Sequence, residues 1–149
     1  MQLRSSVAGC NNGARPRRVV RLDMPDLSTL VILIAEDDKL LAEIAAETLR
    51  EEGHTVLLAH DGDEALLKLH QDSAVDLLLT DINMPRRNGI SLAKAAKTAW
   101  PSLAVMFTSG RVFEPREFPF PATFLAKPFT ARQLIAAVGK RDLGDLRVS

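Results

Sequence analysis

The stretch VDLLLTDINMP, residues 75–85, runs from a nearly continuous apolar segment straight into an acid, Asp81, and then into a polar turn that ends at Pro85. An apolar run of this length between turn residues is typical of a strand covered on both faces, as in the centre of a parallel sheet. A charge directly after such a strand needs a partner, because an unpaired buried charge is costly. We therefore expect a central strand over residues 75–80 with Asp81 at its carboxyl end.

Four further apolar runs of the same kind occur along the chain, at residues 31–35, 55–59, 103–107 and 123–126. Amphipathic stretches separate most of them. Strands that alternate with helices are the signature of repeated βα units, in which the strands form a parallel sheet. The sequence therefore predicts an α/β domain with a doubly wound, five-stranded parallel sheet and helices on both faces.

Start and stop signals mark the helices between these strands. In the first helix, apolar positions recur at helical spacing, and a glycine follows where a C-terminal cap is expected: Leu41, Ile44, Ala45, Thr48, Leu49 and Gly53. The spacing of Asp61 and Glu64, and of Thr130 and Gln133, is that of a capping box. These pairs predict the starts of the second helix and of the last one.

The connection between the last two predicted strands differs from the others. Pro115, Pro119 and Pro121 all fall within residues 111–121. Proline removes a backbone donor and clashes with the preceding helical turn, so it breaks a helix interior. We expect the fourth helix to be short, irregular or missing.

Length and composition are those of one globular domain, because the chain has 149 residues, of which 46% are hydrophobic and 26% are charged. Residues 1–28 differ, with five arginines among Ser, Asn, Gly and Pro. We interpret them as a flexible basic arm, with a nucleic-acid-contacting tail or a targeting peptide as the alternatives. The predicted domain covers residues 29–142, and a short tail covers residues 143–149.

Charge and cysteine usage limit the partners of the protein. The 19 basic and 19 acidic side chains cancel, so no net field attracts nucleic acid or an anionic membrane. No apolar run approaches the roughly 18 residues that span a bilayer. Cys10 is the sole cysteine, which excludes an internal disulfide and favours a reducing, cytoplasmic compartment. We expect a protein partner that is recognised locally.

Chemically active side chains follow the predicted strands. Ligands of an open parallel sheet bind beyond the carboxyl ends of its strands. The residues at those ends are Glu36, Asp37 and Asp38, then Asp81, then Thr108, then Lys127. Acids that converge from neighbouring strands repel one another unless a cation neutralises them, and Mg²⁺ suits carboxylates beside a phosphate. The pattern favours phosphoryl transfer to Asp81 as the nucleophile, with Thr108 and Lys127 as flanking donors.

Four segments resemble the receiver domain of two-component response regulators: residues 34–38, 79–85, 107–110 and 124–129. The resemblance spans residues 30 to 142 and implies the flavodoxin-like strand order 2-1-3-4-5. It also implies that Glu36, Asp37 and Asp81 bind Mg²⁺ together with the backbone carbonyl of Asn83. Thr108 and Lys127 would contact the phosphoryl oxygens, with Thr108 and Phe124 as switch residues. Phe124 stands where this family commonly has tyrosine.

The resemblance implies a phosphoacceptor rather than an enzyme. The phosphodonor would be a sensor histidine kinase or a phosphotransfer protein. The shortened fourth helix resembles that of stand-alone, single-domain receivers, which act as phosphorelay intermediates or as switches that bind a downstream protein. The kinase, the signal and the downstream protein are not readable from the sequence.

Other interpretations remain at this point. The acids at 36–38 would also serve as a helix cap, Lys127 as a solvated lysine and Thr108 as a β-branched strand residue. A pseudo-receiver that binds partners without phosphorylation is one alternative function. A phosphatase of similar fold would need an acid at Asn83, and a nucleotide-binding domain would need a glycine-rich loop at Glu36.

Overall fold

The computed structural model describes residues 29–72 and 74–140 of the chain. The predicted arm, residues 1–28, and the predicted tail, residues 143–149, lie outside the described residues. Within the described part, no helix is long and apolar enough to span a bilayer.

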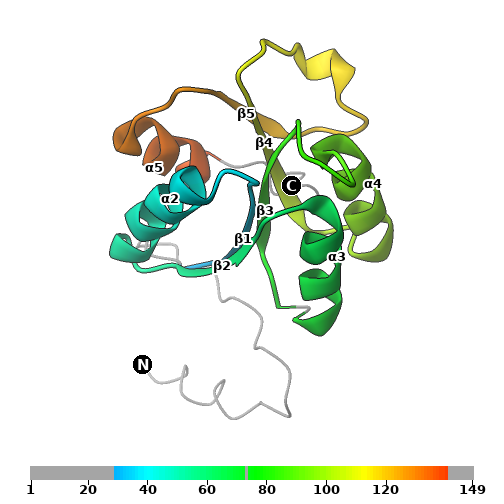
Figure 1. Cartoon of the computed structure of the whole chain (residues 1–149), viewed down its shortest axis with the longest axis horizontal. Coiled ribbons are helices and arrows are strands. Elements are labelled where there is room, and N and C mark those ends of the chain that lie inside the picture. Colours follow the sequence, from blue (N-terminus) through cyan, green and yellow to red (C-terminus); the bar gives the residue numbers. More distant parts are fainter. Residues whose placement is uncertain (1–28, 73, 141–149) are drawn as a thin grey trace, which may run out of the picture.

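Five parallel strands form one sheet in the order β2-β1-β3-β4-β5 (Figure 1). They are β1 (Val31–Ala35), β2 (Thr55–Ala59), β3 (Leu77–Asp81), β4 (Ala104–Ser109) and β5 (Thr123–Ala126). The apolar runs of the sequence coincide with these strands to within two residues at each end. The predicted fold class and strand order are confirmed.

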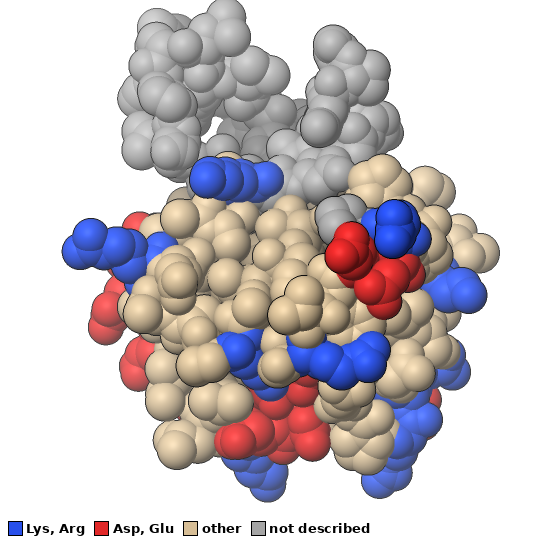
Figure 2. Space-filling model, turned by 90° about the horizontal axis from the view of Figure 1, so that it is seen from above, with Lys and Arg blue, Asp and Glu red and all other residues tan. Residues whose placement is uncertain are grey.

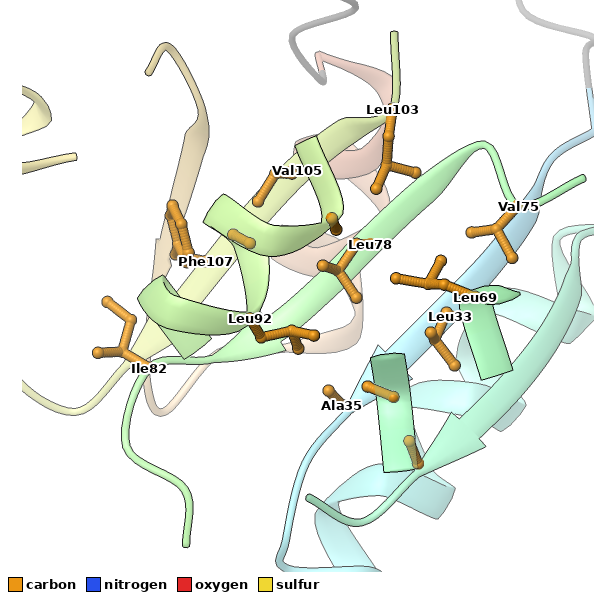
Figure 3. Close-up of a cluster of buried hydrophobic side chains, with 14 of the residues drawn as sticks. Leu33, Ala35, Leu69, Val75, Leu78, Ile82, Leu92, Leu103, Val105 and Phe107 are labelled. Atoms are coloured by element: carbon orange, nitrogen blue, oxygen red, sulfur yellow. The ribbon is translucent and has the colours of Figure 1, made fainter. Parts of the chain in front are cut away.

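Two helices cover each face of the sheet (Figure 1). The helices α2 (Lys39–Glu51) and α5 (Ala131–Gly139) lie on one face, and α3 (Gly62–Gln71) and α4 (Gly89–Ala99) lie on the other. Side chains of β1 and β3 alternate between the two cores, as the twofold period of a strand requires. Leu33 and Leu78 face α3 and α4 (Figure 3), whereas Ile34 and Leu79 face α2 and α5.

The buried face of α2 differs from the predicted one. Leu41 and Ile44, which were expected to face the core, are 42% and 55% exposed. The residues that pack inward are Ala42, Ala45, Ala46 and Leu49. The helical spacing was therefore right. Of the predicted apolar positions, Ala45 and Leu49 pack inward, whereas Leu41 and Ile44 are exposed.

The predicted helix starts are present. The Thr130 side chain accepts from the backbone N–H of Gln133, and the Gln133 side chain accepts from the N–H of Thr130, which completes a capping box. Asp61 likewise accepts from the N–H of Glu64, but the Glu64 side chain accepts from His60 instead of from Asp61. Both helices therefore begin where the sequence placed them.

Residues 110–122, the β4–β5 segment, contain only a three-residue 3₁₀ helix, Pro115–Glu117. The expectation of a short or irregular helix is confirmed. Phenyl rings hold the segment against the sheet. The Phe118 ring lies with its centroid 4.6 Å from that of Phe107 in β4, and about 6 Å from those of Phe113 and Phe124. Phe118 is only 8% exposed and thus serves as the anchor of the segment.

Two basic side chains donate hydrogen bonds to the outer edge of β2. The Arg50 guanidinium donates to the carbonyl of Val56 at 3.0 Å, and the Lys68 ammonium donates to the carbonyl of Leu58 at 2.6 Å. These carbonyls are two residues apart, so they point to the same side of the strand. Outward-facing acceptors of this edge strand are therefore already bonded within the chain.

Candidate functional site

The ends of four adjacent strands bring the predicted site residues together. Asp81 ends β3 and pairs in register with Thr108 of β4. Glu36 directly follows β1, the other neighbour of β3, and its backbone N–H donates to Ala59. The N–H of Lys127, just beyond β5, donates to the carbonyl of Ser109. Parallel ladders thus fix all four positions at one edge of the sheet.

The Lys127 ammonium joins two of the acids. It lies 2.8 Å from an oxygen of Glu36 and 3.2 Å from an oxygen of Asp81. Both carboxyl groups are buried, with 8% of each side chain exposed, and the lysine side chain is 20% exposed. Partly desolvated ion pairs of this kind are screened far less by salt than surface pairs. Glu36 and Lys127, which are 91 positions apart in the sequence, thus form one charged unit with Asp81.

Burial and charge act against each other in this unit. Burial raises the pKa of Glu36, and the hydrogen bond from Lys127 only partly offsets that effect. Burial also lowers the pKa of Lys127, but the hydrogen bond to Glu36 and the charges of Glu36 and Asp81 outweigh it, so this pKa lies above its ordinary value. The lysine stays charged at neutral pH. The acids, in contrast, would be stabilised by a further cation.

The acid cluster has the chemistry of a magnesium site. One carboxylate oxygen from each of Glu36, Asp37 and Asp81 lies within 4.8 Å of the others. Such hard oxygen ligands, with one exposed carboxylate open to water, fit the preferences of Mg²⁺. Asn83, whose carbonyl was predicted as a further ligand, lies nearby, because its N–H donates to Asp81 at 3.4 Å.

Asp38 has a different role from the two acids before it. Its side chain accepts from the backbone N–H groups of Leu40 and Leu41, which makes it the N-terminal cap of α2. The helix-capping interpretation therefore holds for the last of the three acids. Glu36 supports the same turn, because its other oxygen accepts from the N–H of Asp38 at 3.1 Å.

Comparison with known proteins agrees with this geometry. Residues 32–139 match the family described as the response regulator receiver domain. The chain belongs to this family. The transcriptional regulatory protein CpxR of Escherichia coli K12 is 36% identical over 110 residues, which cover 72% of this chain and 47% of CpxR. The chain thus spans about half the length of such curated relatives.

Relatives of receiver size and solved receiver structures are also similar. The response regulator receiver protein CpdR of Brucella abortus is 35% identical over 113 residues, 73% of this chain and 93% of CpdR. The receiver domain of the hybrid histidine kinase CckA superposes with a TM-score of 0.65 at 35% identity, covering 74% of this chain and 96% of that one. A receiver protein from Sinorhizobium medicae gives a TM-score of 0.69 at 30% identity, covering 77% and 95%.

The two residues predicted as switch residues, Thr108 and Phe124, lie on β4 and β5. Thr108 is 3% exposed and sits beside Asp81 in the sheet. Phe124 pairs in register with Phe107, the neighbour of Thr108 along β4. The Phe124 ring contacts Phe113 and Phe118 at 6.0 and 6.1 Å between centroids. The side chain at the family's tyrosine position is therefore packed into the β4–β5 segment by ring contacts.

Two glycines that support the site were not singled out for this role. A Cβ at Gly89 would lie 2.1 Å from the carbonyl oxygen of Asp81, and one at Gly62 would lie 2.3 Å from the carbonyl oxygen of Arg87. The first glycine lets α4 start against the backbone of Asp81. The second lets α3 start against the loop between β3 and α4. Neither approach was predictable from the sequence, because each depends on the fold.

Ion pairs hold the loop between β3 and α4. Arg86 has a positive φ of 68°, which is uncommon for a residue with a side chain. Its guanidinium lies 3.5 Å from Asp61, and that of Arg87 lies 3.2 Å from Asp63. The loop that carries Asn83 is thus tied to the N-terminus of α3. The peptide bond between Lys127 and Pro128 is cis.

Proposed function

We propose that this receiver accepts a phosphoryl group on Asp81 from a histidine-bearing donor, either a sensor histidine kinase or a phosphotransfer protein. The observation that carries the proposal is the bridge from the Lys127 ammonium to both Asp81 and Glu36. A positive charge thus lies beside the buried carboxylate of Asp81, the proposed nucleophile. Electrostatic stabilisation of this kind is what phosphoryl transfer chiefly needs.

The residues divide the chemistry among them. A carboxylate oxygen of Asp81 attacks phosphorus, the bond from phosphorus to the donor nitrogen breaks, and the nitrogen keeps the electron pair. Lys127 and the hydroxyl of Thr108 donate to the phosphoryl oxygens. Glu36, Asp37, Asp81 and the carbonyl of Asn83 would hold Mg²⁺, which supplies positive charge to the same oxygens. The product is a mixed anhydride on Asp81.

Recognition of the donor requires local contacts. Acidic and basic side chains lie in small separate groups on the face shown in Figure 2, and neither sign covers it. Beside the site, α2 exposes three apolar side chains, with Leu40, Leu41 and Ile44 at 68%, 42% and 55% exposure. Apolar groups grouped on one helix support docking of a donor helix over this surface.

The output of the proposed switch runs through β4 and β5. Phosphorylation of Asp81 would draw Thr108 toward the new oxygens and change the packing of Phe124 against the β4–β5 segment. Because phenylalanine lacks a hydroxyl, the change would be one of packing alone. We infer a protein-binding switch or a phosphorelay intermediate. The lone Cys10 supports a reducing, cytoplasmic setting for this role.

Intact mass spectrometry tests the proposal. The protein is incubated with Mg²⁺ and phosphoramidate, or with a phosphorylated histidine kinase. We expect one phosphoryl adduct on the wild type and none on Asp81→Asn. Asp72→Asn, at the far end of α3, serves as the matched control and keeps the adduct. An adduct that survives Asp81→Asn would contradict the proposal. The lack of an adduct on the wild type with any donor would also contradict it and would favour a pseudo-receiver.

A further inference from the structure

The outer face of α2 carries both apolar and acidic side chains. Four exposed residues on successive turns define it: Leu40, Glu43, Ile44 and Glu47. They are three or four positions apart, so they share one side of the helix, opposite the side that packs on the sheet. Within residues 29–72 and 74–140, neither Glu43 nor Glu47 has an ion-pair partner. We call these four residues the α2 outer face.

The charge of α2 is opposite to that of the arm, residues 1–28. Residues 38–52 contain five acids and two bases, a balance of −3, whereas the arm contains five arginines and two aspartates, a balance of +3. Three of the arginines fall in one short stretch with apolar neighbours, RRVVRL, residues 17–22. A segment that mixes basic and apolar side chains is the counterpart of a surface that mixes acidic and apolar ones.

The arm joins the domain beside the C-terminal end of α2. A Cβ at Gly53, just after α2, would lie 3.6 Å from a side-chain carbon of Thr29. Arg21 is eight positions before Thr29, and an extended chain spans about 3.3 Å per residue, so this arginine can reach about 26 Å from Thr29. A helix rises by about 1.5 Å per residue, so Glu47 and Glu43 lie within about 15 Å of the end of α2. The arm is therefore long enough to run along the helix.

We propose that residues 17–22 dock on the α2 outer face of the same chain. The arginines lie against Glu43 and Glu47, and the apolar side chains lie against Leu40 and Ile44. Docking there covers the apolar surface that we proposed for the phosphodonor, so the arm competes with the donor for α2. The docking does not depend on phosphorylation, whereas the competition rests on the proposed function. The arm thus acts as an inhibitor of transfer from a protein donor.

The covalent connection makes weak contacts sufficient for this docking. Exposed ion pairs contribute little each, and salt screens them. A segment joined to its target by a short linker, however, has an effective concentration on the order of 1 mM, so a modest affinity already populates the docked state. A donor that is present below this concentration has to displace the segment. The same contacts between two copies lack the connection, which favours the arm of the same chain as the occupant.

Paramagnetic relaxation in the full-length chain tests the docking. A nitroxide is attached at position 16 in the variant Pro16→Cys/Cys10→Ser. The spin-labelled chain is enriched in ¹⁵N and diluted with an excess of unenriched chain without the label, so only contacts within one chain are observed. We expect the amide signals of residues 39–47 to broaden, those of α3 and α4 to stay sharp, and about 0.5 M NaCl to remove most of the broadening. Sharp signals along α2 at low salt would overturn the inference.

Charge reversal identifies the partners. Arg17→Glu with Arg21→Glu should reduce the broadening along α2 about threefold or more, and so should Glu43→Lys with Glu47→Lys. The combination of both pairs of substitutions should restore it, because opposite charges face each other again. Glu114→Lys, at an exposed acid of the β4–β5 segment, is the matched control and should leave the broadening unchanged. Broadening that does not respond to any of these charges would contradict the proposed contacts.

Transfer rates test the competition. With a phosphorylated histidine kinase as donor, the Arg17→Glu/Arg21→Glu chain should acquire the adduct on Asp81 about threefold or more faster than the wild type. Phosphoramidate, which does not dock on α2, should react equally fast with both chains. Equal rates with the kinase would overturn the competition. No adduct with any donor would overturn the proposed function and the competition with it, whereas broadening along α2 would still support the docking.

Other occupants give different outcomes. Broadening that is seen only when the nitroxide is on unenriched chains, mixed with enriched chains that lack it, would show docking between copies and overturn the inference. A nucleic-acid role of the arm is recognised in the same way. If the Arg17→Glu/Arg21→Glu chain loses affinity for a DNA duplex while the α2 signals of the spin-labelled chain are sharp without DNA, the arm contacts nucleic acid and the inference is wrong.

Discussion

The candidate site around Asp81 and the β4–β5 segment adjoin each other but are held by different forces. Parallel backbone ladders and one lysine that bridges two acids fix the site. The segment has a three-residue 3₁₀ helix and is anchored by phenyl rings, chiefly by Phe118. Hydrogen bonds and ion pairs hold the site, whereas burial of aromatic rings holds the β4–β5 segment. Phosphoryl transfer and stability of the fold should therefore respond to different substitutions.

The largest effect is expected for Lys127→Met. The variant keeps the length of the side chain but loses the charge that stabilises the transferring group, so adduct formation on Asp81 should slow by about 10²- to 10³-fold. The measurement is the rate of adduct formation with phosphoramidate and Mg²⁺. Lys94→Met, an exposed lysine of α4, is the control and should react like the wild type. A Lys127→Met rate within a few fold of the wild type would show that the bridge is structural.

The next prediction concerns the β4–β5 segment and the variant Phe118→Ala. Removal of this buried ring should lower the free energy of unfolding by about 3 kcal/mol, because it takes away apolar burial and leaves a cavity. Urea denaturation measures this loss. At a temperature where the variant is folded, we expect adduct formation within a few fold of the wild-type rate. A parallel loss of stability and of transfer would mean that the two regions form one unit.

Binding of Mg²⁺ should stabilise the folded protein. A ligand that binds only the folded protein, at about one hundred times its Kd, raises the free energy of unfolding by about 2.7 kcal/mol. We expect a rise in the thermal midpoint with MgCl₂ and a much smaller one for Asp37→Asn. Glu51→Gln, an exposed acid at the end of α2, is the control. The same midpoint with and without Mg²⁺ in the wild type would contradict the assignment of the acid cluster.

The smallest effect concerns alkaline pH. The pKa of Lys127 is raised in the folded protein, so its contribution to stability is present below the ordinary lysine value of 10.5 and is lost as the pH rises through the folded pKa. The free energy of unfolding should fall more in the wild type than in Lys127→Met between about pH 8 and pH 12. Equal slopes for the two proteins would indicate that the ion pairs of Lys127 contribute nothing to folding.

The sequence predicted the sheet and the gathering of the site residues well, because both depend on local pattern. Apolar runs marked the strands, and the parallel arrangement brought their carboxyl ends to one edge. Lys127 and Glu36 are 91 positions apart, yet each follows a strand directly, so their proximity was predictable. The roles of the site residues in phosphorylation remain predictions, as does the flexible arm.

Other features depend on contacts that no local pattern contains. Prolines showed where a long helix could not form, but not that Phe118 would pack between Phe107 and Phe124. The apolar face of α2 was predicted only in part. Helical spacing identified Ala45 and Leu49, which are buried, but also Leu41 and Ile44, which are exposed. The spacing alone does not show which part of an apolar stripe contacts the sheet, because that depends on tertiary packing. Gly89 was likewise understood only once its approach to Asp81 was visible.

The bonded outer edge of β2 has a consequence for how the protein behaves among copies of itself. A foreign strand that tried to extend the sheet there would have to displace Arg50 and Lys68 from the carbonyls of Val56 and Leu58. Edge strands are otherwise templates for aggregation and fibril growth. Arg50 and Lys68 look like ordinary surface charges in the sequence. Their hydrogen bonds should oppose the addition of a foreign strand to the β2 edge and thus oppose polymerisation there.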